Sequence, residues 1–213
     1  MKSRKVVTRS GRGFRGYFPS RKLNRMVEWE SLLERDAILH FEFSHGVVDY
    51  QEQPEIIHYE QDGETRKYHP DFALVLKNDK QLHVEVKPKV KLDTLKLQER
   101  FKAIAERYQN HSAQFRILTE HDLRQEPRLS NFKTIASVTH FPPAEEVVAD
   151  LKAQLCHLRP ATSFNDLVGK IGLRNGLWLI AQGILHCDLN LDLRSPLNLT
   201  RIAKEADHDA LYI

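Results

Sequence analysis

The sequence predicts an α/β fold, in which a mixed β-sheet is flanked by helices and followed by a small helical domain. Three observations lead to this prediction. Up to about residue 141, short segments of alternating apolar residues are interspersed with segments of helical periodicity. Pro142 and Pro143 then interrupt the chain. Beyond them, three short helical patterns are followed by one alternating segment.

Size and composition fit a globular protein. A chain of 213 residues, 41% hydrophobic and 29% charged, has enough core for a medium domain and a small one. No apolar segment is long enough to cross a bilayer and none begins the chain, so we expect neither membrane insertion nor secretion. Cys156 and Cys187 form no CxxC pair, and we expect reduced thiols in a cytoplasmic protein.

Residues 1–22 are predicted to form a basic, flexible arm. Residues 1–25 contain nine Lys or Arg and no Asp or Glu, whereas the rest of the chain carries a net charge of −6. Basic segments attract polyanions because binding releases condensed counterions, so nucleic acid is the expected partner. A solubilising tail is the alternative. The arm residues expected to contact DNA are Arg4, Lys5, Arg9, Arg12 and Arg15.

The first domain is predicted at residues 23–141. Its helices and strands are predicted from the spacing of apolar residues and from turn residues such as Asp62-Gly63. A helix at its start carries apolar residues on one side, and a later helix is capped by Asp93 or Thr94. In chain order we expect a helix at 29–43, a strand at 47–51, a polar hairpin at 55–68, an apolar hairpin at 70–87, a helix at 94–108, a strand at 115–118 and a short helix at 119–123.

The predicted hairpin at residues 70–87 has one charged face and one apolar face. One face carries Asp71, Glu85 and Lys87. An odd-length loop near residues 78–80 keeps both apolar sets on the other face, and in that register Asp71 lies across from Lys87, with Glu85 on the neighbouring diagonal. The apolar face comprises Phe72, Leu74, Leu76, Leu82, Val84 and Val86.

Two carboxylates and an ammonium group on one face predict a site for a divalent metal ion beside a phosphate. Asp71 and Glu85 would be ligands of Mg²⁺, with the main-chain carbonyl of Val86 as a third, and Mn²⁺ should substitute. Lys87 would hold or deprotonate the attacking water, or stabilise charge in the transition state. The alternative is a solvent-exposed strand face with a cross-strand ion pair.

Residues outside the hairpin add to this candidate site. Glu34 could supply a further carboxylate, although Ser31 and Glu34 also fit a capping box. Both roles are compatible if the amino end of the helix points at the metal. Lys89 and Lys91 follow the hairpin and could bind the DNA backbone.

A second domain is predicted at residues 142–213. Helices are expected over about 147–155, 163–171 and 175–185, and the segment 188–193 alternates like a strand. This pattern resembles a winged helix-turn-helix, and small helical bundles share it.

Pro70-Asp71 followed by Glu85-Val86-Lys87 resembles the PD-(D/E)xK signature of restriction-endonuclease-like nucleases. The flanking segments narrow the resemblance to TnsA, the endonuclease subunit of heteromeric DNA transposases. These segments are residues 30–36, Gln53-Pro54, residues 69–72, residues 85–88 and residues 119–122.

The resemblance implies a restriction-endonuclease-like fold and a Mg²⁺-dependent endonuclease that cuts the 5′, non-transferred strands of double-stranded DNA at transposon ends. A DDE-type transposase subunit would cut and join the 3′ ends, and a regulatory ATPase would bind the C-terminal domain. Glu34 matches the helix-borne acidic residue, Asp71 the motif aspartate, and Glu85 and Lys87 the two polar positions. Some family members have glutamine in place of Glu85. The expected location is the bacterial cytoplasm, at the nucleoid when active.

Two other functions fit the same residues. A stand-alone restriction or junction-resolving nuclease would cut DNA without partners. A non-catalytic DNA-binding adaptor would use the basic arm and the winged-helix-like domain, and it would not bind metal through Asp71 and Glu85.

Overall fold

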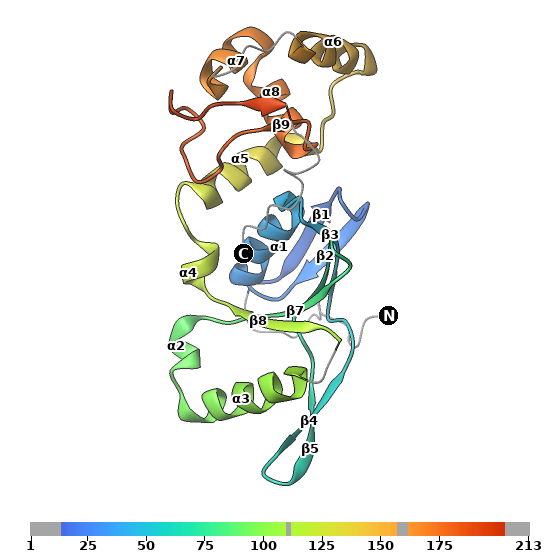
Figure 1. Cartoon of the computed structure of the whole chain (residues 1–213), viewed down its shortest axis with the longest axis vertical. Helices are drawn as coiled ribbons and strands as arrows, with labels where there is room; N and C mark the ends of the chain where they lie inside the picture. Colours follow the sequence, from blue (N-terminus) through green and yellow to red (C-terminus); the bar gives the residue numbers. More distant parts are fainter. Residues whose placement is uncertain (1–13, 110–111, 157–161, 203–213) are drawn as a thin grey trace. The chain divides into compact units, whose positions relative to one another are not determined.

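The computed structural model describes residues 14–109, 112–156 and 162–202. The chain divides into two compact units between Arg124 and Gln125, and each unit is described by itself (Figure 1). Within the described part of the chain, no helix combines the length and the hydropathy that a membrane span requires.

The first unit is built on a four-stranded mixed sheet with the strand order β3-β6-β7-β8. The β3–β6 and β6–β7 pairs are antiparallel, and β7 and β8 are parallel. A parallel pair needs a crossover connection, which α2 and α3 supply. The mixed sheet flanked by helices is therefore confirmed. The elements are β3 (Val47–Glu52), β6 (Phe72–Leu76), β7 (Gln81–Val86), α2 (Lys89–Leu92), α3 (Leu95–Gln109) and β8 (Gln114–Leu118).

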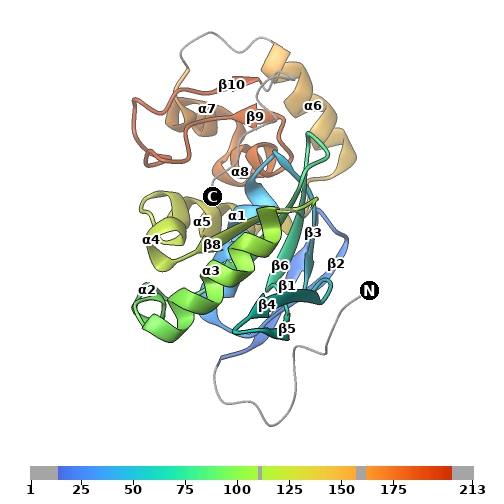
Figure 2. The ribbon, with the colours of Figure 1, turned by 60° about the horizontal axis from the view of Figure 1, so that its bottom comes forward.

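Other elements lie on both faces of this sheet (Figure 2). The apolar residues packed between them and the sheet bury its central strand β7. On one face, α1 (Leu32–Phe43) packs against β3, β6 and β7. On the other, α3 packs with the hairpin of β4 (Ile57–Gln61) and β5 (Glu64–Tyr68). The apolar residues on the face covered by α1 form one cluster, called the first cluster below. It contains all six residues of the predicted apolar face, which confirms that prediction: Phe72, Leu74, Leu76, Leu82, Val84 and Val86.

The predicted register of the β6–β7 hairpin is wrong by two residues. Phe72 pairs with Val84, so Asp71 comes next to Glu85 rather than Lys87. The cause is a tight loop: residues 77–79 connect Leu76 to Lys80, which are joined by a main-chain hydrogen bond of 2.9 Å. Asp79 closes it at φ +59°, a conformation that aspartate tolerates. The loop is odd in length, as expected, and this keeps each side chain on its predicted face.

The expected basic arm at residues 1–22 differs from the structure in its second half. Residues 1–13, with Arg4, Lys5, Arg9 and Arg12, lie outside the described residues. Residues 16–20 form β1 (Gly16–Ser20), which pairs antiparallel with β2 (Arg25–Trp29). The apolar side chains of Phe18, Leu23 and Trp29 pack against the first cluster, and this burial favours a strand over a free tail.

Lys22 lies in the turn between these two strands and caps the carboxyl end of α1. Its Nζ donates to the main-chain carbonyls of Phe41, Ser44 and Val47 at 2.7, 2.8 and 2.6 Å. Burial lowers the pKa of Lys22 to about 8, and the charge of Glu42 opposes that shift. Carbonyls at a helix end lack partners within the helix, so the ammonium group stabilises the turn that leads from α1 into β3.

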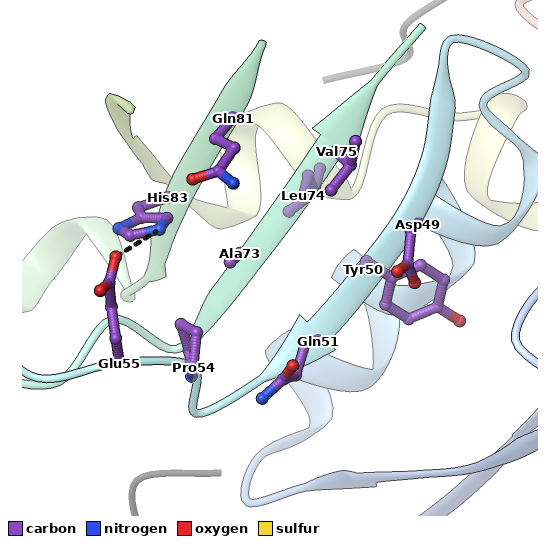
Figure 3. A pocket seen from close by; sticks show the side chains of 10 residues that line it. All are labelled: Asp49, Tyr50, Gln51, Pro54, Glu55, Ala73, Leu74, Val75, Gln81 and His83. Carbon is purple, nitrogen blue, oxygen red and sulfur yellow. Dashed lines mark ion pairs between the residues drawn. The ribbon is translucent and has the colours of Figure 1, made fainter. Parts of the chain in front are cut away.

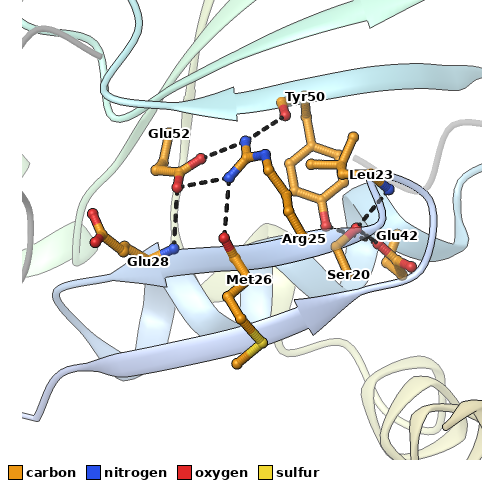
Figure 4. A network of polar contacts seen from close by, with 8 residues as sticks. All are labelled: Ser20, Leu23, Arg25, Met26, Glu28, Glu42, Tyr50 and Glu52. Carbon is orange, nitrogen blue, oxygen red and sulfur yellow. Dashed lines mark hydrogen bonds and ion pairs between the residues drawn. The ribbon is translucent and has the colours of Figure 1, made fainter. Parts of the chain in front are cut away.

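Two carboxylates join the β1–β2 hairpin to the rest of the unit (Figure 4). Glu42 accepts from the hydroxyls of Ser20 and Tyr50, both at 2.7 Å. Glu52, at the end of β3, forms a bidentate ion pair with Arg25 at 2.9 and 2.7 Å. Glu52 is only 1% exposed, so this pair is largely withdrawn from water.

The second unit is mainly helical, and it begins earlier than the predicted boundary at residues 141/142. A helix that the sequence pattern did not indicate, α5 (Arg128–Thr139), belongs to this unit. Its Asn131 side chain donates to the carbonyls of Leu189 and Leu191 at 2.9 and 2.8 Å. The other elements are α6 (Glu145–Cys156), α7 (Phe164–Ile171), α8 (Leu173–Ala181), β9 (Leu185–His186) and β10 (Arg201–Ile202).

The alternating segment 188–193 is not a strand. Asn198 accepts from the main-chain N–H of Asp188 at 2.9 Å and donates to the Asp188 carbonyl at 2.9 Å. Together with the contacts of Asn131, these hydrogen bonds satisfy main-chain groups of the segment, which is therefore a loop rather than a strand. Leu189 and Leu193 are buried all the same, which explains the alternating pattern.

Candidate active site

The four predicted site residues come from three neighbouring parts of the first unit. Asp71 immediately precedes β6, Glu85 is the penultimate residue of β7, and Lys87 directly follows β7. Glu34 lies in the first turn of α1. Glu85 is only 4% exposed, which excludes a solvated strand face for this residue.

The Glu85 carboxylate is held at both oxygens. Its Oε1 lies 2.7 Å from the Nζ of Lys87, and its Oε2 accepts a hydrogen bond of 2.8 Å from the Tyr68 hydroxyl. Burial raises the pKa of Tyr68, and the charge of Glu85 raises it further, so the phenol stays protonated and donates. The sequence prediction missed Tyr68. The available signal was its position in the sequence, because Tyr68 directly precedes the His69-Pro70-Asp71 segment that carries a predicted site residue.

Asp71 is fixed through its main chain and its side chain. Its carbonyl accepts from the N–H of Gln53 at 2.9 Å, and its Oδ2 accepts from the N–H of Val86 at 2.8 Å. Its Oδ1 has no hydrogen bond with any described residue. Burial raises the pKa of Asp71 well above its ordinary value, the charge of Glu85 adds to this, and Lys87 opposes it.

Glu34 caps α1 and also belongs electrostatically to the site. Ser31 is the N-cap: its Oγ accepts from the Glu34 N–H at 3.1 Å and donates to Glu34 Oε1 at 3.0 Å. Glu34 Oε2 accepts from the N–H of Glu30 at 2.8 Å, one residue before the position a capping box would use. Burial raises the pKa of Glu34 while the charge of Lys87 lowers it, and the charge of Glu34 helps to raise the pKa of Asp71.

The charge balance of this cluster fits a cation. Three carboxylates lie near one ammonium group. Burial raises the pKa of Asp71, and the charges of Glu85 and Glu34 raise it further. Carboxylate and carbonyl oxygens are the donors that Mg²⁺ and Mn²⁺ prefer. As the side chains stand, no three Asp, Glu, His or Cys residues of the described ranges converge on one point suitable for a metal ion. The donor set of Asp71, Glu85 and the Val86 carbonyl contains only two such side chains, and Glu85 Oε1 is engaged by Lys87.

The predicted DNA-binding residues within the described ranges are Arg15, Lys89 and Lys91. Arg15 is half-buried just before β1, and both lysines are exposed on α2, directly after Lys87. The main-chain N–H of Lys89 donates to Glu120 Oε2 at 2.8 Å, which ties the start of α2 to α4 (Glu120–Leu123).

A separate pocket of about 350 Å³ lies on the sheet face beside β4 (Figure 3). His83 is one of its buried titratable residues, with 2% of its surface exposed. The ring lies 3.7 Å from a carboxylate oxygen of Glu55, and its Nδ1 lies 2.7 Å from the Tyr108 hydroxyl. None of the four predicted site residues lines this pocket.

Comparison with known proteins supports the motif. No curated protein matches the chain. Residues 44–120 match the family described as "TnsA-like endonuclease N terminal". The matched segment runs from the end of α1 to the start of α4, so it contains Asp71, Glu85 and Lys87, whereas Glu34 precedes it. Residues 44–120 are thus similar to the TnsA-like endonuclease N-terminal family, which supports the resemblance carried by the sequence motifs.

Proposed function

We propose that this protein is a metal-dependent DNA endonuclease that cuts the 5′, non-transferred strands at transposon ends. The observation that carries the proposal is the family match over residues 44–120, within which Asp71 and Glu85 lie on adjacent strands beside Lys87. Its partners would be a DDE-type transposase subunit and a regulatory ATPase, the latter at the C-terminal unit. The proposed location is the bacterial cytoplasm, at the nucleoid during the reaction.

Asp71, Glu85 and the Val86 carbonyl would hold Mg²⁺ or Mn²⁺, with Glu34 as a further carboxylate. Such an ion, when bound, lowers the pKa of a coordinated water and neutralises charge on phosphate oxygens. Glu85 would have to share or release its contact with Lys87 to take part. The hydrogen bond from Val86 keeps Asp71 Oδ2 oriented, which leaves Oδ1 for the ion.

Lys87 is suited to act as a charged donor. Burial lowers its pKa, but the carboxylates of Glu85 and Asp71 outweigh burial, and the net pKa is raised. An ammonium group cannot accept a proton from water. In this proposal Lys87 therefore orients the attacking water and stabilises the charge that builds up on the phosphate as one P–O bond forms and another breaks.

The DNA backbone would be bound by basic residues around this site. Lys89 and Lys91 on α2 follow Lys87 directly, and Arg15 precedes β1. The basic residues Arg4, Lys5, Arg9 and Arg12 would add counterion release, which makes binding strongly dependent on salt.

The test is strand cleavage of transposon-end DNA in a reaction that contains the neighbouring transposase and ATPase. The wild-type protein should cut the 5′ strands with Mg²⁺ and not with EDTA, and Asp71→Ala should abolish cutting. Asp49→Ala is the matched control, because Asp49 is an exposed aspartate on β3 that lines the separate pocket. Normal cutting by Asp71→Ala would refute the proposal.

Two other outcomes would indicate the alternative functions. Robust cutting of plasmid DNA by the isolated protein would favour a stand-alone nuclease. DNA binding with no divalent-ion binding that depends on Asp71 and Glu85 would favour a non-catalytic adaptor.

A further inference from the structure

We propose that Tyr68 is a positioning residue of the candidate active site: its hydroxyl holds the Glu85 carboxylate in the orientation in which Asp71 and Glu85 bind a divalent cation. This inference rests on the proposed metal-dependent function. It assigns a role in that site to the β4–β5 hairpin, which contributes none of the residues predicted from the sequence.

The geometry places Tyr68 on one side of Glu85 and Lys87 on the other. Tyr68 OH donates to Oε2 at 2.8 Å, while Lys87 Nζ lies 2.7 Å from Oε1. A carboxylate with one donor on each oxygen has little freedom to rotate about its last bond. If Lys87 shifts toward a phosphate, the Tyr68 contact remains and keeps Oε2 in place.

Packing alone does not account for the Tyr68 hydroxyl. The residue is 1% exposed, and its ring packs edge-on against Phe115, with the ring centroids 5.9 Å apart. A phenylalanine would supply the same ring contacts, and a buried hydroxyl is costly unless it finds a partner. Its partner is Glu85. The surrounding cluster is otherwise composed mainly of apolar and aromatic residues, including Ile57, Phe101, Ile104 and Ala113.

Removal of the hydroxyl would leave Glu85 Oε2 buried without this donor. A buried carboxylate oxygen that lacks a donor favours rotation of the side chain toward another donor, which weakens cation binding. Hydrogen bonds that orient metal ligands are typically worth a factor of about 10–100 in metal affinity. We therefore expect a loss of that size in Tyr68→Phe.

The experiment is a titration of the full-length protein with Mn²⁺ alone, in which free Mn²⁺ is followed by its electron paramagnetic resonance signal. Tyr68→Phe should bind Mn²⁺ at least about tenfold more weakly than wild type. Tyr108→Phe is the matched control, because it removes a buried tyrosine hydroxyl from the same cluster, one that contacts His83 at 2.7 Å. This control should bind Mn²⁺ like wild type.

A double-mutant cycle separates positioning from a general effect on the core. In a Glu85→Ala background, Tyr68→Phe should cause less than a twofold further loss of Mn²⁺ affinity, because its partner is already absent. Full additivity of the two losses would overturn the inference, as would an unchanged affinity in Tyr68→Phe. Failure of Tyr68→Phe to fold, judged by circular dichroism, would likewise overturn it, since the role would then be structural.

The same titration distinguishes this inference from the proposed function. If wild-type protein binds no Mn²⁺, or if Asp71→Ala binds it equally well, the proposed metal site itself fails. If wild type binds Mn²⁺ through Asp71 while Tyr68→Phe is unaffected, only the role of Tyr68 fails.

Discussion

The main-chain N–H of Val86 donates to the Asp71 carboxylate at 2.8 Å, so the strand that carries Glu85 also orients the aspartate. This bond fixes one carboxylate oxygen. Burial raises the pKa of the group, and the Glu85 charge on the adjacent strand raises it further. The two acidic residues are thus held close together at an electrostatic cost. A bound cation would relieve that cost.

Asp71→Asn should stabilise the metal-free protein at neutral pH. Burial, and then the charge of Glu85, raise the pKa of Asp71 in the folded state. A raised folded-state pKa contributes stability at low pH, and this contribution is lost as the pH rises through that pKa. In urea denaturation with EDTA, the two proteins should be similar near about pH 4, and the variant should become the more stable one toward pH 8. A wild type more stable than Asp71→Asn at pH 8 would contradict this.

Lys87→Gln should separate cation binding from cleavage. The substitution removes the only ammonium group paired with Glu85 among the described residues, so the site becomes more negative. Mn²⁺ affinity should stay the same or rise, while cleavage in the complete reaction should fall by a factor of about 100 or more, because one donor that stabilises the transition-state charge is lost. A parallel loss of Mn²⁺ binding would show that Lys87 supports the ligands rather than the reaction.

The apolar face of the β6–β7 hairpin could be predicted from alternation alone, because a buried face tolerates few polar residues. The register could not. A shift of two residues leaves every side chain on its face, so Asp71 opposite Lys87 and Asp71 beside Glu85 satisfy the same pattern. The choice between them was made by the three-residue loop and by Asp79 at φ +59°.

Two other features had weak signals in the sequence. Helix α5 has little amphipathic character: it buries Asn131 and Thr139 together with Leu129, Phe132 and Ile135. Tyr68 lies at the end of β5, which pairs with β4, whereas Glu85 lies on β7 of the four-stranded sheet. The alternation of residues within one strand carries no information on a contact between two different sheets. The capping box predicted for Ser31 and Glu34 is only half formed: Ser31 caps the Glu34 N–H, but the Glu34 carboxylate accepts from the N–H of Glu30 rather than that of Ser31.

Arg25→Met should destabilise the first unit. Its partner Glu52 is 1% exposed and would keep a buried charge without the bidentate guanidinium. Removing one member of a buried pair costs about 3–5 kcal/mol, and because Arg25 is 35% exposed we expect about 2 kcal/mol in urea denaturation. Arg25→Met combined with Glu52→Gln should recover part of this loss. If the losses of unfolding free energy in the two single variants simply add in the double variant, the buried Glu52 carboxylate does not need Arg25 as its partner.

Ser31→Ala should lower both stability and cleavage. Loss of an N-cap costs about 1 kcal/mol, and here the Ser31 hydroxyl also contacts Glu34 Oε1. Ser163→Ala is a matched control, because Ser163 caps α7 in the second unit and contacts Asp166 in the same way. Both variants should lose about 1 kcal/mol in thermal denaturation, but only Ser31→Ala should slow cleavage. Equal cleavage rates would mean that Glu34 does not depend on its cap.

Gly176→Ala should destabilise the second unit. A Cβ at this position would lie 2.7 Å from Val168 Cγ1, on the facing helix α7. Overpacking of this kind costs about 1–3 kcal/mol. Gly169→Ala, within α7 and facing open space, should instead add about 0.5–1 kcal/mol through its helix propensity. Hydrogen exchange of α7 and α8 would measure both effects, and protection unchanged in Gly176→Ala would contradict the expected clash.

The Lys22 ammonium group on the end of α1 has a practical consequence for deletion mutants. Removing the chain as far as residue 22 would take away basic residues proposed to bind DNA. It would also remove the ammonium group that caps α1, the helix whose opposite end carries Glu34. A loss of cleavage in such a shortened protein would be ambiguous. A deletion that ends at residue 13 spares β1 and the Lys22 contacts, so it would remove four of the basic residues proposed to bind DNA without removing this cap.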